Sequence, residues 1–217
     1  MLRIEKFVCG ALENNVYLLV AEDSHECAVV DPGMECGAVL RRIEKAGLIA
    51  RYLLLTHAHF DHVFSVAEFK DSLGAEVVMH RDDLPMLERL VDSAAAWGFS
   101  NARPAPAPDI FVEHGQTLDL AGDSLEVRHT PGHSPGQVAY IFGGNAFVGD
   151  TLFWHGVGRW DLPGGDFELL KRSIEEQLFT LPGETVVWPG HGESTTIDTE
   201  RRLNPYIGEG ARFIPKL

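Results

Sequence analysis

Short apolar runs and amphipathic stretches alternate along the first part of the chain. Residues 16–20 and 27–31 are apolar runs separated by the polar turn 22–25, and they predict two strands. Residues 39–47 place apolar side chains at helical spacing and end at a glycine, which predicts a helix, and residues 52–55 predict a buried strand. This succession of strand, helix and strand is typical of a layered α/β fold.

The middle of the chain continues the alternation. Amphipathic spacing predicts a helix over 63–74, a strand over 76–79 and a second helix over 81–97, which ends before Gly98. Residues 103–108 contain three prolines and must be extended and non-helical. The shortness of this segment favours a surface loop over a domain boundary.

The remaining sequence predicts short strands punctuated by glycine, then a helix and a last strand. The predicted strands are 110–112, 117–120, 125–129, 138–142, 146–148 and 185–188, and the predicted helix is 166–178. Each half of the chain thus combines strands with flanking helices. We expect one α/β domain over residues 1–217.

Composition narrows the class of protein. The chain is 45% apolar, enough for one real core, and it has no apolar run of eighteen residues and no signal-peptide layout. We therefore expect a soluble, cytoplasmic protein with no membrane partner. The net charge of −14 disfavours nucleic acid as a partner. The three cysteines lack zinc-knuckle spacing and predict buried, reduced thiols.

A histidine-rich stretch directly follows the predicted strand 52–55. His57, His59, Asp61 and His62 stand within six residues. Residues two apart in extended backbone point to the same side, so His57 and His59 can converge on one ion, with Asp61 and His62 beside them. Imidazole and carboxylate ligands suit zinc, manganese and iron, and they favour a catalytic metal site over a thiolate-rich structural one.

Three further candidate ligands follow glycines at the ends of predicted strands. They are His133, Asp150 and His191. Each one alone is more typical of a turn or a cap than of a metal site. Together with the histidine-rich stretch they make seven candidate ligands, enough for two ions with Asp150 as the bridge.

In this order the seven residues resemble the ligand motif of the metallo-β-lactamase superfamily, and the resemblance extends over nearly the whole chain. It implies a four-layer αββα sandwich. It also implies two ligand sets that share Asp150: one adds His57, His59 and His133, and the other adds Asp61, His62 and His191.

Three motifs are similar to those of small bacterial glyoxalase II enzymes: Gly149-Asp150-Thr151-Leu152-Phe153, Gly158-Arg159-Trp160-Asp161-Leu162-Pro163-Gly164-Gly165 and Pro189-Gly190-His191-Gly192. The similarity implies hydrolysis of a small-molecule thioester, such as S-lactoylglutathione, by a hydroxide that bridges two divalent metal ions. Zinc is the expected metal, with iron and manganese as alternatives. Asp61 and Asp150 are the expected catalytic residues, Asp61 by orienting the attacking water and Asp150 as the bridge.

Several alternatives stay open at this stage. A persulfide dioxygenase with one iron would use His57, His133 and Asp150. Other ester or lactone hydrolysis and a non-catalytic metal-binding role are also compatible with the motif. Asp150 stands where the best-known zinc β-lactamases have a cysteine, which disfavours antibiotic hydrolysis. Few residues follow His191, so the C-terminal helical domain that helps hold glutathione in full-length glyoxalase II is not expected.

The remaining candidates have weaker signals. We expect Arg159 and Asp161 to form an ion pair within a rigid loop. Three residues could line the mouth of the site: Trp154, His155 and Trp160. Trp97 and Phe99 are expected in the core. Four histidines are expected to face solvent or to pack without chemical partners: His25, His80, His114 and His129.

Overall fold

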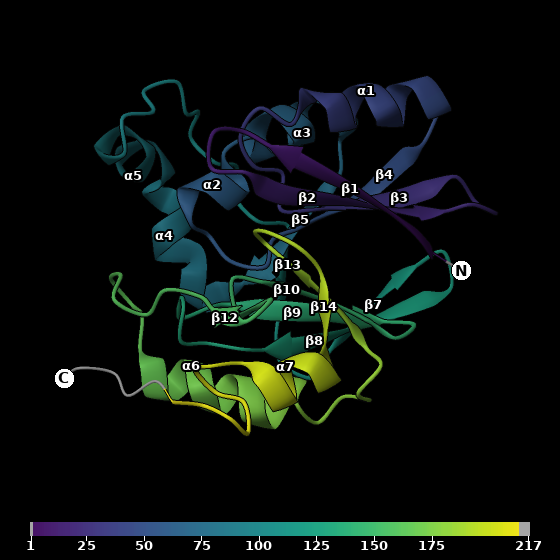
Figure 1. Ribbon diagram of the computed structural model, residues 1–217. Helices are drawn as coiled ribbons and strands as arrows, with labels where there is room; N and C mark the ends of the chain where they lie inside the picture. Colours follow the sequence, from purple (N-terminus) through teal and green to yellow (C-terminus); the bar gives the residue numbers. More distant parts are fainter. Residues whose placement is uncertain (1, 213–217) are drawn as a thin grey trace.

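Two six-stranded β-sheets lie face to face in the computed structural model, which describes residues 2–212 (Figure 1). The first sheet has the order β1 (Leu2–Cys9), β2 (Asn14–Ala21), β3 (Glu26–Val30), β4 (Ile49–Leu54), β5 (Glu76–His80) and β6 (Ile110–Val112). The second has the order β14 (Thr195–Thr196), β13 (Val186–Pro189), β10 (Asn145–Gly149), β9 (Val138–Phe142), β8 (Asp123–His129) and β7 (Thr117–Leu120). A separate hairpin joins β11 (Leu152–Phe153) to β12 (Gly156–Val157).

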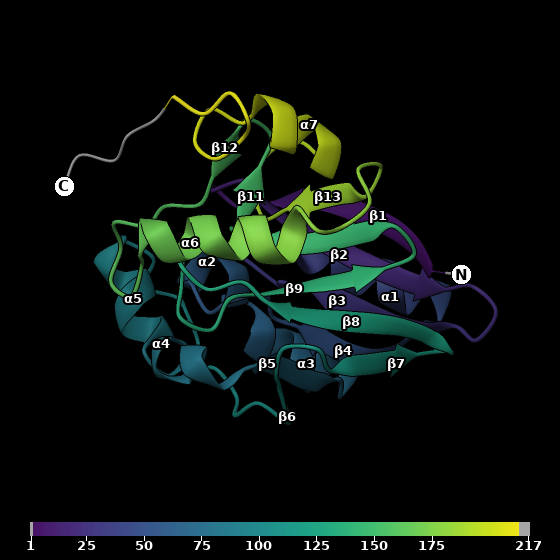
Figure 2. The same ribbon diagram turned by 90° about the horizontal axis from the view of Figure 1, so that it is seen from below.

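Helices cover the outer face of each sheet. They are α1 (Gly37–Ala46), α2 (Phe60–Val63), α3 (Val66–Leu73), α4 (Leu84–Glu88), α5 (Leu90–Ala96), α6 (Phe167–Ser173) and α7 (Ile197–Leu203). Figures 1 and 2 show α1 and α3 on the first sheet and α6 and α7 on the second. The layers therefore run helix, sheet, sheet, helix, and the expected αββα sandwich is confirmed.

The core between the sheets explains the apolar runs in the sequence. Tyr17 and Leu54 from the first sheet pack with Val127 and Tyr140 from the second. Along β2, alternate residues point to the opposite face and pack against the helices that cover the first sheet. Because β2 is buried on both faces, its residues 16–21 are continuously apolar instead of alternating.

Strand direction places the functional loops at one edge of the sandwich. β3, β4, β5 and β6 pair in parallel, so their carboxyl ends lie together. In the second sheet β10 and β13 are also parallel. Five candidate ligands lie on the loops that follow β4, β8, β10 and β13, and the other two, Asp61 and His62, lie on α2, which follows the loop after β4.

Two predicted helices are interrupted. The helix predicted over 63–74 begins earlier, at Phe60, and breaks between α2 and α3. The helix predicted over 81–97 is a 3-10 turn followed by α4 and α5, with Pro85 in the first turn of α4, where proline favours a new helix start. The turn at Arg81–Asp83 lies at the edge that holds the loops, where Asp83 accepts from Ala58 N–H.

Other differences concern elements that the apolar pattern does not show. β1 was not predicted because it contains Arg3, Glu5 and Lys6 and lies at the edge of its sheet. β11, β12 and β14 are two residues long, and α7 is a short helix capped by the Thr196 side chain, which accepts from Thr199 N–H. The segment 103–108 is non-helical, as predicted. Among residues 2–212, no helix is both long and apolar enough to cross a membrane.

Candidate metal centre

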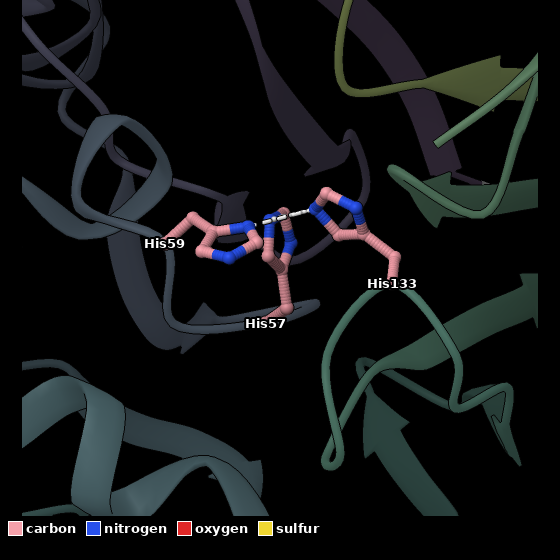
Figure 3. A group of neighbouring side chains, drawn as sticks. All are labelled: His57, His59 and His133. Carbon is pink, nitrogen blue, oxygen red and sulfur yellow. Dashed lines mark hydrogen bonds between the residues drawn. The ribbon is translucent and has the colours of Figure 1, made fainter. Parts of the chain in front are cut away.

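Three histidines form the first half of the candidate centre. His57 and His59 lie on the loop after β4, and His133 lies on the loop after β8 (Figure 3). His59 Nδ1 is 2.7 Å from His133 Nε2, which is 3.3 Å from His57 Nε2. Nitrogens that bind one zinc ion at about 2.0–2.1 Å must lie a little over 3 Å apart. The three rings therefore have the spacing of a shared ligand set.

A second group lies beside the first. His62 Nε2 is 3.2 Å from His191 Nε2, and His191 Nε2 is 3.2 Å from Asp61 Oδ2. His62 is fully buried, whereas the His191 side chain is 28% exposed. Solvent or a ligand thus reaches the centre from the side of His191.

Asp150 lies between the two groups. Its Oδ2 is 3.6 Å from His133 Nε2 and 3.8 Å from His191 Nε2, and its Oδ1 is 3.4 Å from His62 Nε2. Among the described residues, Oδ1 has no hydrogen-bond partner although it is buried. A buried carboxylate oxygen without a donor is costly unless a cation neutralises it, so the donor set fits a pair of divalent ions.

Local backbone brings Asp150 into this position. The register between β10 and β13 shifts at Phe147 and Gly149, and Gly149 has a φ of 51°. The strand therefore ends in a tight turn that directs the next side chain toward the edge of the sheet.

Glycine also leaves room for the Asp150 carboxylate. A Cβ on Gly190 would lie 2.2 Å from Asp150 Oδ1 and 2.5 Å from His62 Cε1. A Cβ on Gly158 would lie 1.8 Å from the Asp150 carbonyl oxygen. Residue 190 must be glycine for the centre to keep this shape.

Hydrogen bonds at Nδ1 orient the buried histidine rings. His62 Nδ1 donates to Asp31 Oδ2 at 3.0 Å, and His133 Nδ1 donates to the Arg159 carbonyl oxygen at 2.7 Å. Thr56 Oγ1 donates to the same Asp31 oxygen and accepts from His57 Nδ1 at 3.0 Å. Each Nε2 then keeps its lone pair for a metal, which is the usual arrangement around metal-binding histidines.

Asp83 joins the loops of the two sheets. It is fully buried, and its carboxylate accepts from Ala58 N–H at 2.9 Å, Ser134 Oγ at 2.7 Å and Gly136 N–H at 2.6 Å. Burial raises the pKa of Asp83 in spite of these three donors. The carboxylate fixes the loop of His57 and His59 against the loop of His133.

The sequence did not single out Asp31, Thr56 or Asp83 as functional residues. Asp31 ends a strand before Pro32 and Gly33, which is typical of an ordinary turn, and only its φ of 50° in the folded chain marks it as unusual. Asp83 has no sequence feature that distinguishes it from other acidic residues near helix starts.

Burial and neighbouring charges set the protonation of the centre. Burial, with neighbouring histidines, holds the pKa of His57 well below its ordinary value and lowers that of His59 to about 3. Burial opposes ionisation of Asp150, but the charges of His62 and His133 outweigh it and hold the pKa of Asp150 well below its usual range. Burial also opposes the charged form of His62, but the Asp150 and Asp61 carboxylates outweigh it and raise the pKa of His62 well above its ordinary value. His57 and His59 are thus already in the neutral form that binds a cation, whereas a cation would replace the proton of His62.

The residues with weaker sequence signals are an expected ion pair and three residues expected at the mouth of the site. Arg159 and Asp161 form the expected two-pronged ion pair, with both N–O distances at 2.9 Å. Trp160 is half-buried and packs against Phe167 at the edge of the core under α6. Trp154 is exposed and lies against His155.

Trp97 and Phe99 were both expected in the core, and both rings lie near Phe60, but only one of the two expectations is confirmed. Phe99 packs against the core as expected, with its ring centroid 5.7 Å from that of Phe60. Trp97 was wrongly assigned to the core. Its ring lies 5.9 Å from Phe60, but 55% of the residue is exposed because α5 ends at the surface.

The expectation that His80, His114 and His129 have no chemical partners is wrong. The rings of His80 and His129 stack with centroids 4.1 Å apart, and His114 Nδ1 accepts from His129 N–H at 3.4 Å. These residues are far apart in sequence and meet because the two sheets face each other, which the sequence pattern alone does not reveal.

Comparison with known proteins agrees with this geometry. The profile described as the metallo-beta-lactamase superfamily matches residues 9–191, a span that includes all seven candidate ligands. Hydroxyacylglutathione hydrolase GloC of Haemophilus influenzae is 36% identical over 209 residues, which cover 95% of this chain and 98% of that protein.

Two solved structures are also similar. The B3 metallo-beta-lactamase BLEG-1 superposes with a TM-score of 0.88 at 33% identity, covering 94% of this chain and 99% of that one. TTHA1623, solved in a di-iron-bound form, superposes with a TM-score of 0.84 at 41% identity, covering 93% and 99%.

Proposed function

The chain belongs to the metallo-beta-lactamase superfamily, and from this membership we propose that it is a two-metal hydrolase that cleaves small thioesters. Membership itself implies an enzyme of the hydrolase type. The single observation that best supports two metals is the position of Asp150 between two complete groups of nitrogen and oxygen donors. Each ion would then have four protein ligands when the shared carboxylate is counted.

The proposed ligand sets follow the two groups. His57, His59 and His133 would bind one ion, Asp61, His62 and His191 would bind the other, and Asp150 would bridge them. Mixed imidazole and carboxylate ligands suit zinc, iron and manganese. We propose zinc, with iron as the first alternative because the similar TTHA1623 structure is described as di-iron-bound.

The residues around the centre would perform distinct tasks in hydrolysis. A pair of divalent ions, when bound, lowers the pKa of a water molecule and polarises the carbonyl group of an acyl substrate. Asp61, whose carboxylate lies on the accessible side next to His191, would accept a hydrogen bond from the attacking water and orient it. Asp31 and Thr56 would hold His62 and His57 in the tautomers that leave Nε2 free.

A thioester is the proposed substrate class for two reasons. The similar protein of Haemophilus influenzae is a hydroxyacylglutathione hydrolase. A thiol with a pKa of about 8.5 also leaves readily as thiolate, so the reaction needs no dedicated general acid. Every histidine of the centre belongs to one of the two ligand groups, so none is left to act as a general acid, and a thioester does not need one.

β-Lactam hydrolysis is a second candidate, favoured by the TM-score of 0.88 with BLEG-1. Persulfide oxidation with one iron, held by His57, His133 and Asp150, is a third. That reaction would leave Asp61, His62 and His191 without a metal, although they form a group of their own with ligand atoms in close contact. This observation favours two metals over one.

The deciding experiment measures hydrolysis of S-lactoylglutathione by protein reconstituted separately with zinc, manganese and iron, with the metal-free protein as the control. We expect metal-dependent turnover with two ions per chain. In parallel assays, a chromogenic cephalosporin would report β-lactam hydrolysis, and oxygen uptake with glutathione persulfide would report dioxygenase activity. Turnover in either of these assays, with none on the thioester, would refute the proposal.

A further inference from the structure

A second cluster of histidines lies beside the candidate metal centre but shares no residue with it. β5 of the first sheet ends at His80, and β8 of the second sheet ends at His129. Their rings stack across the gap between the sheets, with centroids 4.1 Å apart and planes inclined by 9°. The loop that follows β5 brings Asp82 to the same place, with Oδ2 3.7 Å from His80 Nδ1.

The cluster borders an open cavity of about 440 Å³. His114 and Glu113 line the same cavity, so three imidazoles and two carboxylates face one space. The candidate ligand atoms of His80, Asp82 and His129 lie within 4.8 Å of one another. A cavity of this size holds an ion together with water molecules that complete its coordination.

The hydrogen bonds of the cluster leave lone pairs available. His129 Nε2 donates to the Pro135 carbonyl oxygen at 2.9 Å, so its Nδ1 keeps a lone pair. His80 Nδ1 accepts a long hydrogen bond of 3.2 Å from Asp82 N–H, which a metal could replace. Burial and the neighbouring His129 lower the pKa of His80, so the ring is neutral near pH 7.

We propose that His80, Asp82 and His129 form a further divalent-metal site, separate from the seven-residue centre, that joins the ends of the two sheets. Two imidazoles with a carboxylate select a borderline ion such as Zn²⁺ over Mg²⁺ or Ca²⁺, which prefer oxygen ligands. The cavity is lined by two carboxylates, Asp82 and Glu113, and by one guanidinium, Arg81, so its charge disfavours an anion there. Because lone pairs lie in the ring planes, binding must open the parallel stack by rotation of one imidazole.

The proposed site is connected to the seven-residue centre through residues that are adjacent in sequence or hydrogen-bonded to its members. Asp82 precedes Asp83, which anchors Ala58 and Ser134, and His129 holds the carbonyl of Pro135, two residues after His133. An ion in this position would therefore stabilise the two loops that bear His57, His59 and His133. This role does not depend on which substrate the enzyme cleaves.

Zinc stoichiometry tests the proposal directly. The full-length chain is equilibrated with Zn²⁺ by dialysis, and bound metal is measured by elemental analysis for the wild type and for the double variant His80→Ala, His129→Ala. We expect the double variant to bind one zinc ion fewer than the wild type, whatever number the main centre holds. His25→Asn is the matched control, because His25 lies in an exposed turn, and it should bind as many ions as the wild type.

An equal zinc content in the wild type and the double variant would overturn the proposal. If circular dichroism shows that the double variant is unfolded, the single variants His80→Gln and His129→Gln replace it, and each should lose the same ion. As a second readout, titration of Zn²⁺ into the metal-free wild-type enzyme should shift the NMR signals of the His80 and His129 rings. Unchanged ring signals at saturating Zn²⁺ would also contradict the proposal.

Discussion

The Asp31 carboxylate and the His62 imidazole are hydrogen-bonded to each other in the interior of the protein, with Oδ2 3.0 Å from Nδ1. The same carboxylate accepts from the Thr56 hydroxyl, which in turn accepts from His57. One buried side chain thus orients histidines that belong to both groups of the centre. Asp31 therefore positions ligands of both groups, although it does not touch the accessible side.

Replacement of Asp31 by Asn should weaken metal binding and activity by about 10- to 100-fold, because the amide NH₂ group would face one of the donors around the carboxylate: His62 Nδ1–H and Thr56 Oγ1–H on one side or Thr56 N–H on the other. Metal retention against a chelator and kcat/KM measure the effect. Asp71→Asn, at an exposed ion pair with Arg103, should leave both unchanged. Wild-type metal affinity in Asp31→Asn would show that the hydrogen bond to His62 has no influence on the centre.

Replacement of Asp150 by Asn should lower kcat/KM by more than about 100-fold, since a direct ligand contributes more than its surrounding partners. Elemental analysis should show loss of at least one ion with the fold intact by circular dichroism. Asp161→Asn, which removes only an exposed ion pair, should be close to wild type. An Asp150→Asn protein that keeps both ions and its full rate would disprove the bridging role.

Replacement of Gly190 by Ala should displace the Asp150 carboxylate, because the new methyl group would overlap Oδ1 and the His62 ring. We expect loss of metal and a reduction of about 1–3 kcal/mol in the free energy of unfolding. Urea denaturation measures the stability change. Gly37→Ala is the control, since that glycine begins α1 and a methyl group there meets only the Arg41 guanidinium at 3.4 Å. Normal metal content in Gly190→Ala would contradict the close packing.

Replacement of Asp83 by Asn should destabilise the protein by about 1–3 kcal/mol, because one of three buried donors would face the amide NH₂ group. The loops of His59 and His133 should also separate, which lowers metal affinity. Chemical denaturation and chelator competition test the two effects. Asp119→Asn, on an exposed strand position, should change neither. An effect on stability alone would show that Asp83 does not position the ligands.

The cysteine thiols should resist alkylation in the native protein at pH 8. Burial raises the pKa of Cys27 and of Cys36 to about 12, and it also raises that of Cys9. Burial disfavours the reactive thiolate, so its fraction increases only as the pH approaches those values. Mass spectrometry after iodoacetamide treatment should show unmodified native protein and three modified cysteines in denaturant. Rapid native labelling of Cys36 would indicate local opening near α1.

Most of the fold could be predicted because its strands are buried on both faces and its helices on one. β2 and β3 contain the apolar runs 16–21 and 27–30, and β4 ends in the buried run 52–54, so the hydrophobic pattern predicts all three. β1 could not be predicted, since an edge strand with charged side chains lacks that pattern. The interruption at Arg89 also has no periodic signature, because the apolar spacing continues across it.

The candidate ligands of the centre could be predicted from the sequence, but the residues that orient them could not. The histidines and aspartates of the motif were found because several potential ligands are clustered or follow glycine. Asp31 and Asp83 were missed because their role depends on residues that approach only after folding. The stack of His80 on His129 was missed for the same reason, since it requires both sheets to be in place.

The division of the chain between the two sheets has a practical consequence. β1–β6 form the first sheet, and the second sheet and the β11–β12 hairpin come from later in the chain, so within residues 2–212 the chain passes between the two sheets once, at residues 113–116. A break at that link would yield two fragments, with four of the seven candidate ligands on one and three on the other. Reassembly of the fragments would then depend on divalent ions as well as on the apolar surface between the sheets. The fold is thus suited to a split protein whose complementation reports free metal.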